Sequence, residues 1–156
     1  MLRTTVFAVL AGVATAIFDT SFNGTGQIRT LDHTSGNGTD IGCLTNAGQW
    51  TIVEDNCGVF TGDRNGAMAV YVSSEEGPCG RAQNGSELYF SCSGNQTAFN
   101  FWVFAGYSTR DILVYSEVFT WSSSSTFADA DTDVLPLHSY QTSDPDPWLW
   151  LGWTAL

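Results

Sequence analysis

The sequence predicts an all-β single domain, an antiparallel β-sandwich or flattened barrel with two short-range disulfides. Turn residues recur roughly every 8 to 12 positions, and between them lie short stretches in which apolar and polar side chains alternate. No segment of about 11 residues or more combines helical spacing with capping residues. The four cysteines form two pairs that are close in sequence. Together these observations favour about eight to ten short strands around one apolar core.

The first 16 residues are typical of a secretory signal peptide. Arg3 precedes an apolar run over residues 6–13 that is too short to span a bilayer, and Ala14-Thr15-Ala16 has the small-x-small pattern of a cleavage site. We therefore expect residues 1–16 to be removed and the mature protein to be secreted, without insertion into a membrane. Four Asn-x-Ser/Thr glycosylation sites agree with export: Asn23, Asn37, Asn84 and Asn95.

The charge of the chain argues against several classes of partner. Five basic residues face 16 acidic ones, which gives a formal net charge of −11 at pH 7. Such an acidic surface repels nucleic acid and anionic lipid, so we expect neither as a partner.

Residues 17–40 are rich in Gly, Asn, Thr and Ser, and only residues 26–32 alternate. This predicts a glycosylated, loosely ordered leader with one possible edge strand, followed by the main domain over residues 41–156. From residue 50 onward the alternation becomes regular, and Asp63-Arg64-Asn65-Gly66 predicts a turn. After this turn, one face of a strand is expected to carry Met68, Val70 and Val72, and the other face Ala69, Tyr71 and Ser73. A further strand is expected at 88–92.

Residues 97–107 are the most apolar stretch after the signal peptide, with aromatic side chains in both phases of the alternation. A strand that is apolar on both faces is usually central and covered on both sides. The remaining strands are expected over 111–116, 118–121, 134–140 and 148–156. The prolines at 145 and 147 exclude residues 143–147 from the interior of a ladder.

The cysteines favour local pairing. Four cysteines allow three connectivities, and the sequence does not choose among them. The working framework pairs Cys43 with Cys57 and Cys79 with Cys92, because each pairing needs only two neighbouring strands to meet. An oxidising compartment lets the thiols pair.

Several short pieces of the chain, in their order and spacing, resemble a known module, the C-terminal domain appended to certain fungal ribonucleases of the T2 family. The pieces are Gly42-Cys43-Leu44, Gly48-x-Trp50, Cys57-Gly58-x-Phe60-Thr61, Gly77-Pro78-Cys79-Gly80, Phe90-x-Cys92, residues 125–129, His138 and residues 152–156. The resemblance covers about residues 41 to 156. The histidine motifs of that family's catalytic half have no counterpart here, so the resemblance implies a non-catalytic accessory domain.

The residues themselves offer little for catalysis, and we expect no enzyme. Nucleophilic chemistry needs a histidine near the nucleophile, and the chain has only His33, in the leader, and His138, at a strand position. A glycoside hydrolase would need two facing carboxylates. Candidates are Glu75, Glu76, Glu117 and Asp129.

No cofactor is expected, and calcium is the one metal ion that the sequence suggests. Asp129, Asp131 and Asp133 have the alternate spacing that opens a calcium loop. Val134 and Tyr140 replace the glycine and the glutamate that an EF-hand requires, so the alternatives are a looser calcium site and a solvated acidic turn.

The tryptophans carry the hypothesis about a ligand. Trp148 and Trp150 lie in one phase of a strand that follows two prolines, and exposed indoles at a sheet edge can stack on sugar rings. The leading hypothesis is a secreted binding module for extracellular or cell-wall polysaccharide. The alternatives are a small secreted effector or structural wall protein that recognises a protein partner, and a glycoside hydrolase.

Overall fold

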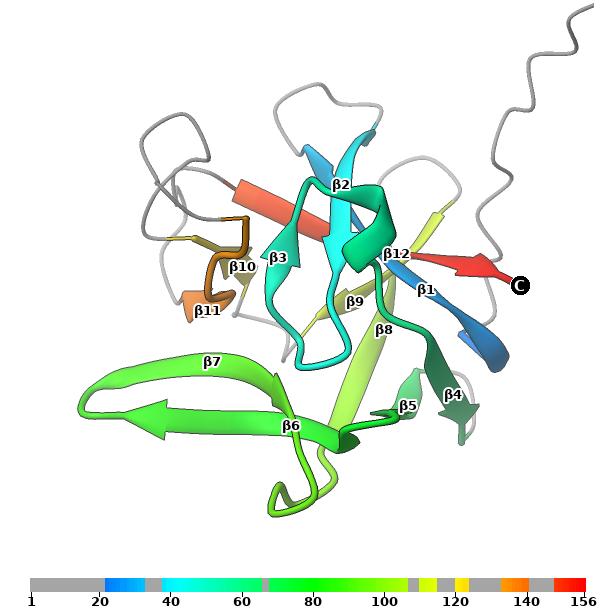
Figure 1. The fold of residues 1–156 in the computed structure, drawn as a ribbon. Helices are drawn as coiled ribbons and strands as arrows, with labels where there is room; N and C mark the ends of the chain where they lie inside the picture. Colours follow the sequence, from blue (N-terminus) through cyan, green and yellow to red (C-terminus); the bar gives the residue numbers. More distant parts are fainter. Residues whose placement is uncertain are drawn as a thin grey trace, which may run out of the picture.

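The computed structural model describes residues 22–32, 38–65, 68–106, 110–114, 120–123, 133–140 and 148–156 (Figure 1). Within these ranges the regular structure is strands and one short 3₁₀ helix, η1 (Glu54–Asn56). The strands are β1 (Gly24–Asp32), β2 (Thr39–Leu44), β3 (Trp50–Thr51), β4 (Phe60–Arg64), β5 (Ala69–Ser74), β6 (Gly77–Asn84), β7 (Glu87–Cys92), β8 (Asn100–Gly106), β9 (Arg110–Val114), β10 (Thr120–Ser122), β11 (His138–Tyr140) and β12 (Trp148–Ala155).

The strands close into an antiparallel barrel, which confirms the predicted fold class. Hydrogen-bonded neighbours run from β1 through β4, β5, β6, β7, β11, β10 and β12, and β12 pairs with β1 again. The hairpin β8–β9 forms a second link between β5 and β12, because β8 pairs with β5 and β9 pairs with β12. The strands β2 and β3 extend the sheet beyond β1.

The strand β1 corrects the expectation of a loose leader with an edge strand. One edge of β1 pairs with β12 from Gly26 to Asp32, and its other edge pairs with β4 and then with β2. A Cβ at Gly26 would lie 2.5 Å from the Trp153 ring, so a larger side chain has no room there. A glycine at this position therefore indicates close packing in the barrel wall and not a loosely ordered segment. Residues 1–21 and 33–37 lie outside the described residues.

The main core fills the barrel with the inward-facing side chains of its strands. Phe90 stacks on Phe101 with ring centroids 5.1 Å apart, and Phe22 packs on Trp153 at 5.4 Å. The indole Nε1 of Trp121 donates a 2.8 Å hydrogen bond to the carbonyl of Leu113, which satisfies a polar group inside this core.

A second, smaller cluster consists of Leu31, Ile112 and Trp150, with Val114 and Trp148 packed against it. In β12, Leu149, Leu151 and Trp153 belong to the main core, so Trp150 and Trp148 occupy the opposite face of that strand. Leu31 and Trp150 are direct partners in the β1–β12 ladder. The outer side of the wall therefore buries apolar side chains of its own.

Both predicted disulfides are present, Cys43–Cys57 and Cys79–Cys92. The second joins β6 to β7, where the two cysteines are direct partners in the ladder. The first ties β2 to the residue after η1. Within the described part of the chain, no helix is long and apolar enough to cross a membrane.

Candidate functional site

The candidate site is the outer face of β4, β5 and β8, which we call the aromatic face and define by Asp63, Asn65, Met68, Tyr71, Asn100 and Trp102. In β5, Val70 and Val72 are buried while Tyr71, between them, is 39% exposed. Tyr71 is the ladder partner of Asp63 on β4 and of Asn100 on β8. Directly opposed residues share a face, so the phenol lies between a carboxylate and an amide side chain.

A hollow of about 170 Å³ opens at one end of the aromatic face. Its lining includes the half-buried indole of Trp102 and the 50%-exposed side chain of Met68, with amides from Asn65 and Asn100. Trp102 is the ladder partner of Ala69, and this small side chain leaves the indole accessible from outside. An apolar wall with a few amide groups is the usual composition of a small-molecule subsite.

Trp102 also corrects an expectation. Residues 97–107 were predicted to form a strand covered on both sides. In β8, Phe101 and Val103 are buried in the main core, while Asn100 is exposed and Trp102 is half-buried. The outward phase of this strand is therefore partly open to solvent at Asn100 and Trp102.

The tail tryptophans do not form the expected exposed pair. Trp150 is only 8% exposed and belongs to the second cluster, and Trp148 is half-buried against the same cluster. Trp150 has no indole face available for stacking on a sugar. The sequence pattern identified the correct phase of β12 but not the apolar neighbours, which come from β1 and β9.

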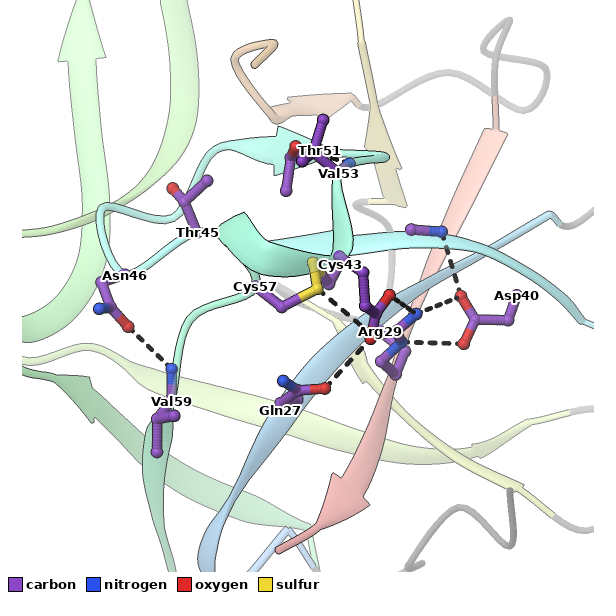
Figure 2. Close-up of a disulfide and its surroundings, with 12 residues drawn as sticks. Gln27, Arg29, Asp40, Cys43, Thr45, Asn46, Thr51, Val53, Cys57 and Val59 are labelled. Carbon is purple, nitrogen blue, oxygen red and sulfur yellow. Dashed lines mark hydrogen bonds and ion pairs between the residues drawn. A yellow bond between two sulfur atoms is a disulfide. The ribbon is translucent and has the colours of Figure 1, made fainter. Parts of the chain in front are cut away.

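Arg29 forms a charged cluster beside the first disulfide (Figure 2). Its guanidinium donates to Asp40 through Nε at 2.8 Å and to Glu54 through Nη1 at 2.7 Å, and Nη1 also lies 3.4 Å from Sγ of Cys57. Burial lowers the pKa of Arg29, but the hydrogen bonds to Glu54 and Asp40 outweigh it and raise that pKa above its ordinary value. The cluster holds β1, β2 and η1 together, and its guanidinium is engaged by the two carboxylates.

The same cluster predicts a pH dependence of stability. The hydrogen bond from Arg29 lowers the pKa of Glu54 below its ordinary 4.5. A lowered folded-state pKa contributes stability above the unfolded-state pKa, and this contribution is lost as the pH falls through the folded value. The difference in unfolding free energy between wild type and Glu54→Gln should therefore be present at pH 7 and shrink below about pH 4.5. Since Glu54 is mostly exposed, we expect at most about 1 kcal/mol.

Urea unfolding at several pH values measures this difference. Glu76→Gln, which alters an exposed carboxylate in the β5–β6 turn, is the control and should show a smaller difference. A Glu54→Gln difference that stayed constant from pH 7 to pH 3 would contradict the ion-pair explanation.

His138 lies in β11 and is buried. Its Nδ1 is 3.9 Å from Oε2 of Glu87, and its ring meets Tyr89 edge-on. Ser122, its ladder partner, donates its hydroxyl to the carbonyl of Ser123 instead. This geometry fits a packed side chain of the barrel wall better than a general base.

Several predicted residues fall partly outside the described ranges. Asp129 and Asp131 lie outside them and Asp133 is exposed, so the calcium site stays a prediction. Of the glycosylation sites, Asn23, Asn84 and Asn95 are exposed in the structure, whereas Asn37, like His33, is not described. Glu75 and Glu76 are adjacent residues of the β5–β6 turn and do not belong to facing strands. Glu117 lies outside the described residues.

The comparison with protein families shows which family the chain belongs to. Residues 20–141 match the model of the RNase T2-like C-terminal domain. The chain belongs to this family. The matched unit is the C-terminal domain and not the catalytic domain of RNase T2-like proteins, which agrees with a non-catalytic module. The match begins before β1, so that strand is part of the RNase T2-like C-terminal domain. Neither the curated proteins nor the solved structures include a match to the chain.

Proposed function

We propose that this RNase T2-like C-terminal domain is a secreted, non-catalytic module that binds extracellular or cell-wall polysaccharide through the aromatic face. The observation that carries the proposal is that half-buried Trp102 lines one hollow with the amide side chains of Asn65 and Asn100. Exposed Tyr71 lies next to this hollow as the ladder partner of Asn100. The two disulfides and the exposed glycosylation sites agree with secretion.

The chemistry of the face suits a sugar. Aromatic rings offer flat apolar surface with a polar edge, and a pyranose ring has an apolar face rimmed by hydroxyl groups. Asn65 and Asn100 can each donate and accept hydrogen bonds, which matches the mixed character of hydroxyl groups. A sheet positions these side chains on a rigid surface, so little conformational entropy is lost on binding.

The experiment measures retention on insoluble polysaccharides by sedimentation, followed by titration with soluble fragments of the polymer that retains the protein. Tyr71→Ala and Trp102→Ala should each weaken binding about tenfold or more, as truncation of an aromatic hot spot does. Tyr71→Phe keeps the ring and should keep most of the affinity. Because Tyr71 is 39% exposed, Tyr71→Ala should lower the free energy of unfolding by only about 1 kcal/mol, and Tyr71→Phe should change it less.

The control is Ile52→Ala, which removes an exposed apolar side chain on the Cys43–Cys57 loop and should leave glycan binding unchanged. Retention of the Tyr71→Ala and Trp102→Ala variants at wild-type level would reject the aromatic face as the site. Failure of the wild-type protein to bind any polysaccharide would reject the function.

One observation favours a protein partner as the second candidate. Ile52, Val53 and Val59 are exposed apolar side chains, and all three lie on or beside the loop that Cys43 and Cys57 close. Exposed apolar side chains that gather on one segment are typical of protein-recognition surfaces. In that case Ile52→Ala and Val59→Ala would weaken binding to the partner, while Tyr71→Ala would not.

A further inference from the structure

The aromatic face continues along β4 and β5 into a second cavity. This groove has a volume of about 440 Å³ and is lined by Asn46, Val59, Thr61, Ser74 and Glu75. Thr61 precedes Asp63 on the outward phase of β4 and is the ladder partner of Ser73. The hollow, Tyr71 and the groove therefore follow one another along the same two strands.

We propose, as an extension of the glycan-binding function above, that the groove is a second subsite of one elongated surface and that this surface takes an amine-bearing glycan chain. The hollow lies beside Ala69 and the groove beside Ser74. A strand rises about 3.3 Å per residue, so the two ends are about 17 Å apart. That length accommodates several linked sugar rings instead of a single one.

The groove is preformed by hydrogen bonds. Asn46 donates its side-chain amide to Oε1 of Glu75, and its Oδ1 accepts from the backbone N–H of Val59 at 2.8 Å. The hydroxyl of Ser74 donates to the carbonyl of Asn46 at 2.6 Å. These contacts fix the Glu75 carboxylate beside the half-exposed side chain of Val59, so that an apolar wall and an anion are presented together.

The exposed carboxylates of the surface favour a glycan that carries amino groups. Asp63 and Glu75 are exposed carboxylates at the middle and at the groove end of the surface. Arg64, which also lies on β4, is ion-paired with Asp111 at 2.8 Å, so its charge is offset. A chain with a net charge of −11 raises the local concentration of cations near such a surface. A glycan that carries ammonium groups meets this field favourably, and an N-acylated glycan of the same backbone does not.

The experiment compares β-1,4-linked glucosamine oligomers with N-acetylglucosamine oligomers of equal length, at a pH where the free amines are protonated. We expect the hexamer of glucosamine to bind more tightly than its dimer and than the acetylated hexamer, with the difference reduced by added salt. Glu75→Gln should weaken the glucosamine hexamer about two- to fivefold, the range for an exposed ion pair. The glutamine keeps an oxygen that accepts the hydrogen bond from Asn46, so the groove retains its shape.

Glu76→Gln is the matched control, because it removes the same charge from the next residue, which does not line the groove. Equal effects of Glu75→Gln and Glu76→Gln, or equal binding of amine and acetylated oligomers, would overturn the inference. Acetylated oligomers that bind and respond only to Tyr71→Ala and Trp102→Ala would also overturn it, while leaving the proposed function intact. If the wild-type protein bound neither these oligomers nor any polysaccharide, the inference and the proposed function would both be rejected.

Discussion

Trp150→Ala should lower the free energy of unfolding by about 3–5 kcal/mol, the usual cost of truncating a buried large aromatic side chain. Trp150 is almost fully buried, and it packs with Leu31 and Ile112 on the outer side of the barrel wall. A small domain has about 5–15 kcal/mol of net stability, so this loss is a large part of the total. Urea unfolding followed by far-UV circular dichroism measures it.

Two other variants test whether the loss of stability is specific to Trp150. Trp148→Ala should cost less, because Trp148 is only half-buried against the same cluster. Trp102→Ala should also cost less, because that indole borders the hollow and part of its surface is already in water. If Trp150→Ala unfolded at the same urea concentration as the wild type, the second cluster would not contribute to stability as the structure indicates.

Local alternation was enough to predict the phases of the strand that carries the candidate site. Val70 and Val72 were expected with Met68 on one face and Tyr71 on the other, and the structure buries the valines and exposes the tyrosine. Met68 lies before the first residue of β5 and is 50% exposed, so the alternation did not place it correctly. The alternation depends only on neighbouring residues, because side chains of a strand point to opposite sides in turn. The role of Tyr71 required its partners on β4 and β8, which the sequence does not place.

The N-terminal strand shows where composition misleads. Glycine and polar residues around β1 suggested a loose leader, but Gly26 is required where the barrel wall meets the Trp153 ring, and Thr30 is fully buried. These residues are small because the interior is full at this point. Composition alone does not distinguish a crowded position from a flexible one.

The outer faces of β8 and β12 depend on contacts that are distant in sequence. Trp150 is buried because Leu31 of β1 lies beside it in the ladder, whereas Trp102 has the small Ala69 of β5 as its ladder partner. Each of the two tryptophans stands between two apolar residues of its own strand. Only the neighbouring strands decide which of the two indoles stays accessible to solvent, so the sequence pattern alone suggested an exposed indole at Trp150, which the structure buries.

Removing either disulfide should destabilise the domain by about 3 kcal/mol through the unfolded state, since the loops closed by the two bonds are nearly equal in length. The two disulfides differ in how deeply they are buried. Cys79 and Cys92 both belong to the main core, whereas in the other pair Cys43 is buried but Cys57 is half-buried beside Arg29. The double variant Cys79→Ala/Cys92→Ala should therefore lose somewhat more stability than Cys43→Ala/Cys57→Ala, because both of its truncated side chains leave space in the core instead of one.

Double variants avoid free thiols, and urea unfolding under non-reducing conditions compares them directly. Cys43→Ala/Cys57→Ala should keep glycan binding through the hollow near wild-type level if it folds, because no cysteine lines that hollow. The opposite result would be a larger loss of unfolding free energy on removal of Cys43–Cys57 than on removal of Cys79–Cys92. It would show that the Arg29 cluster, which contacts Cys57, depends on its disulfide more than the barrel core depends on the other.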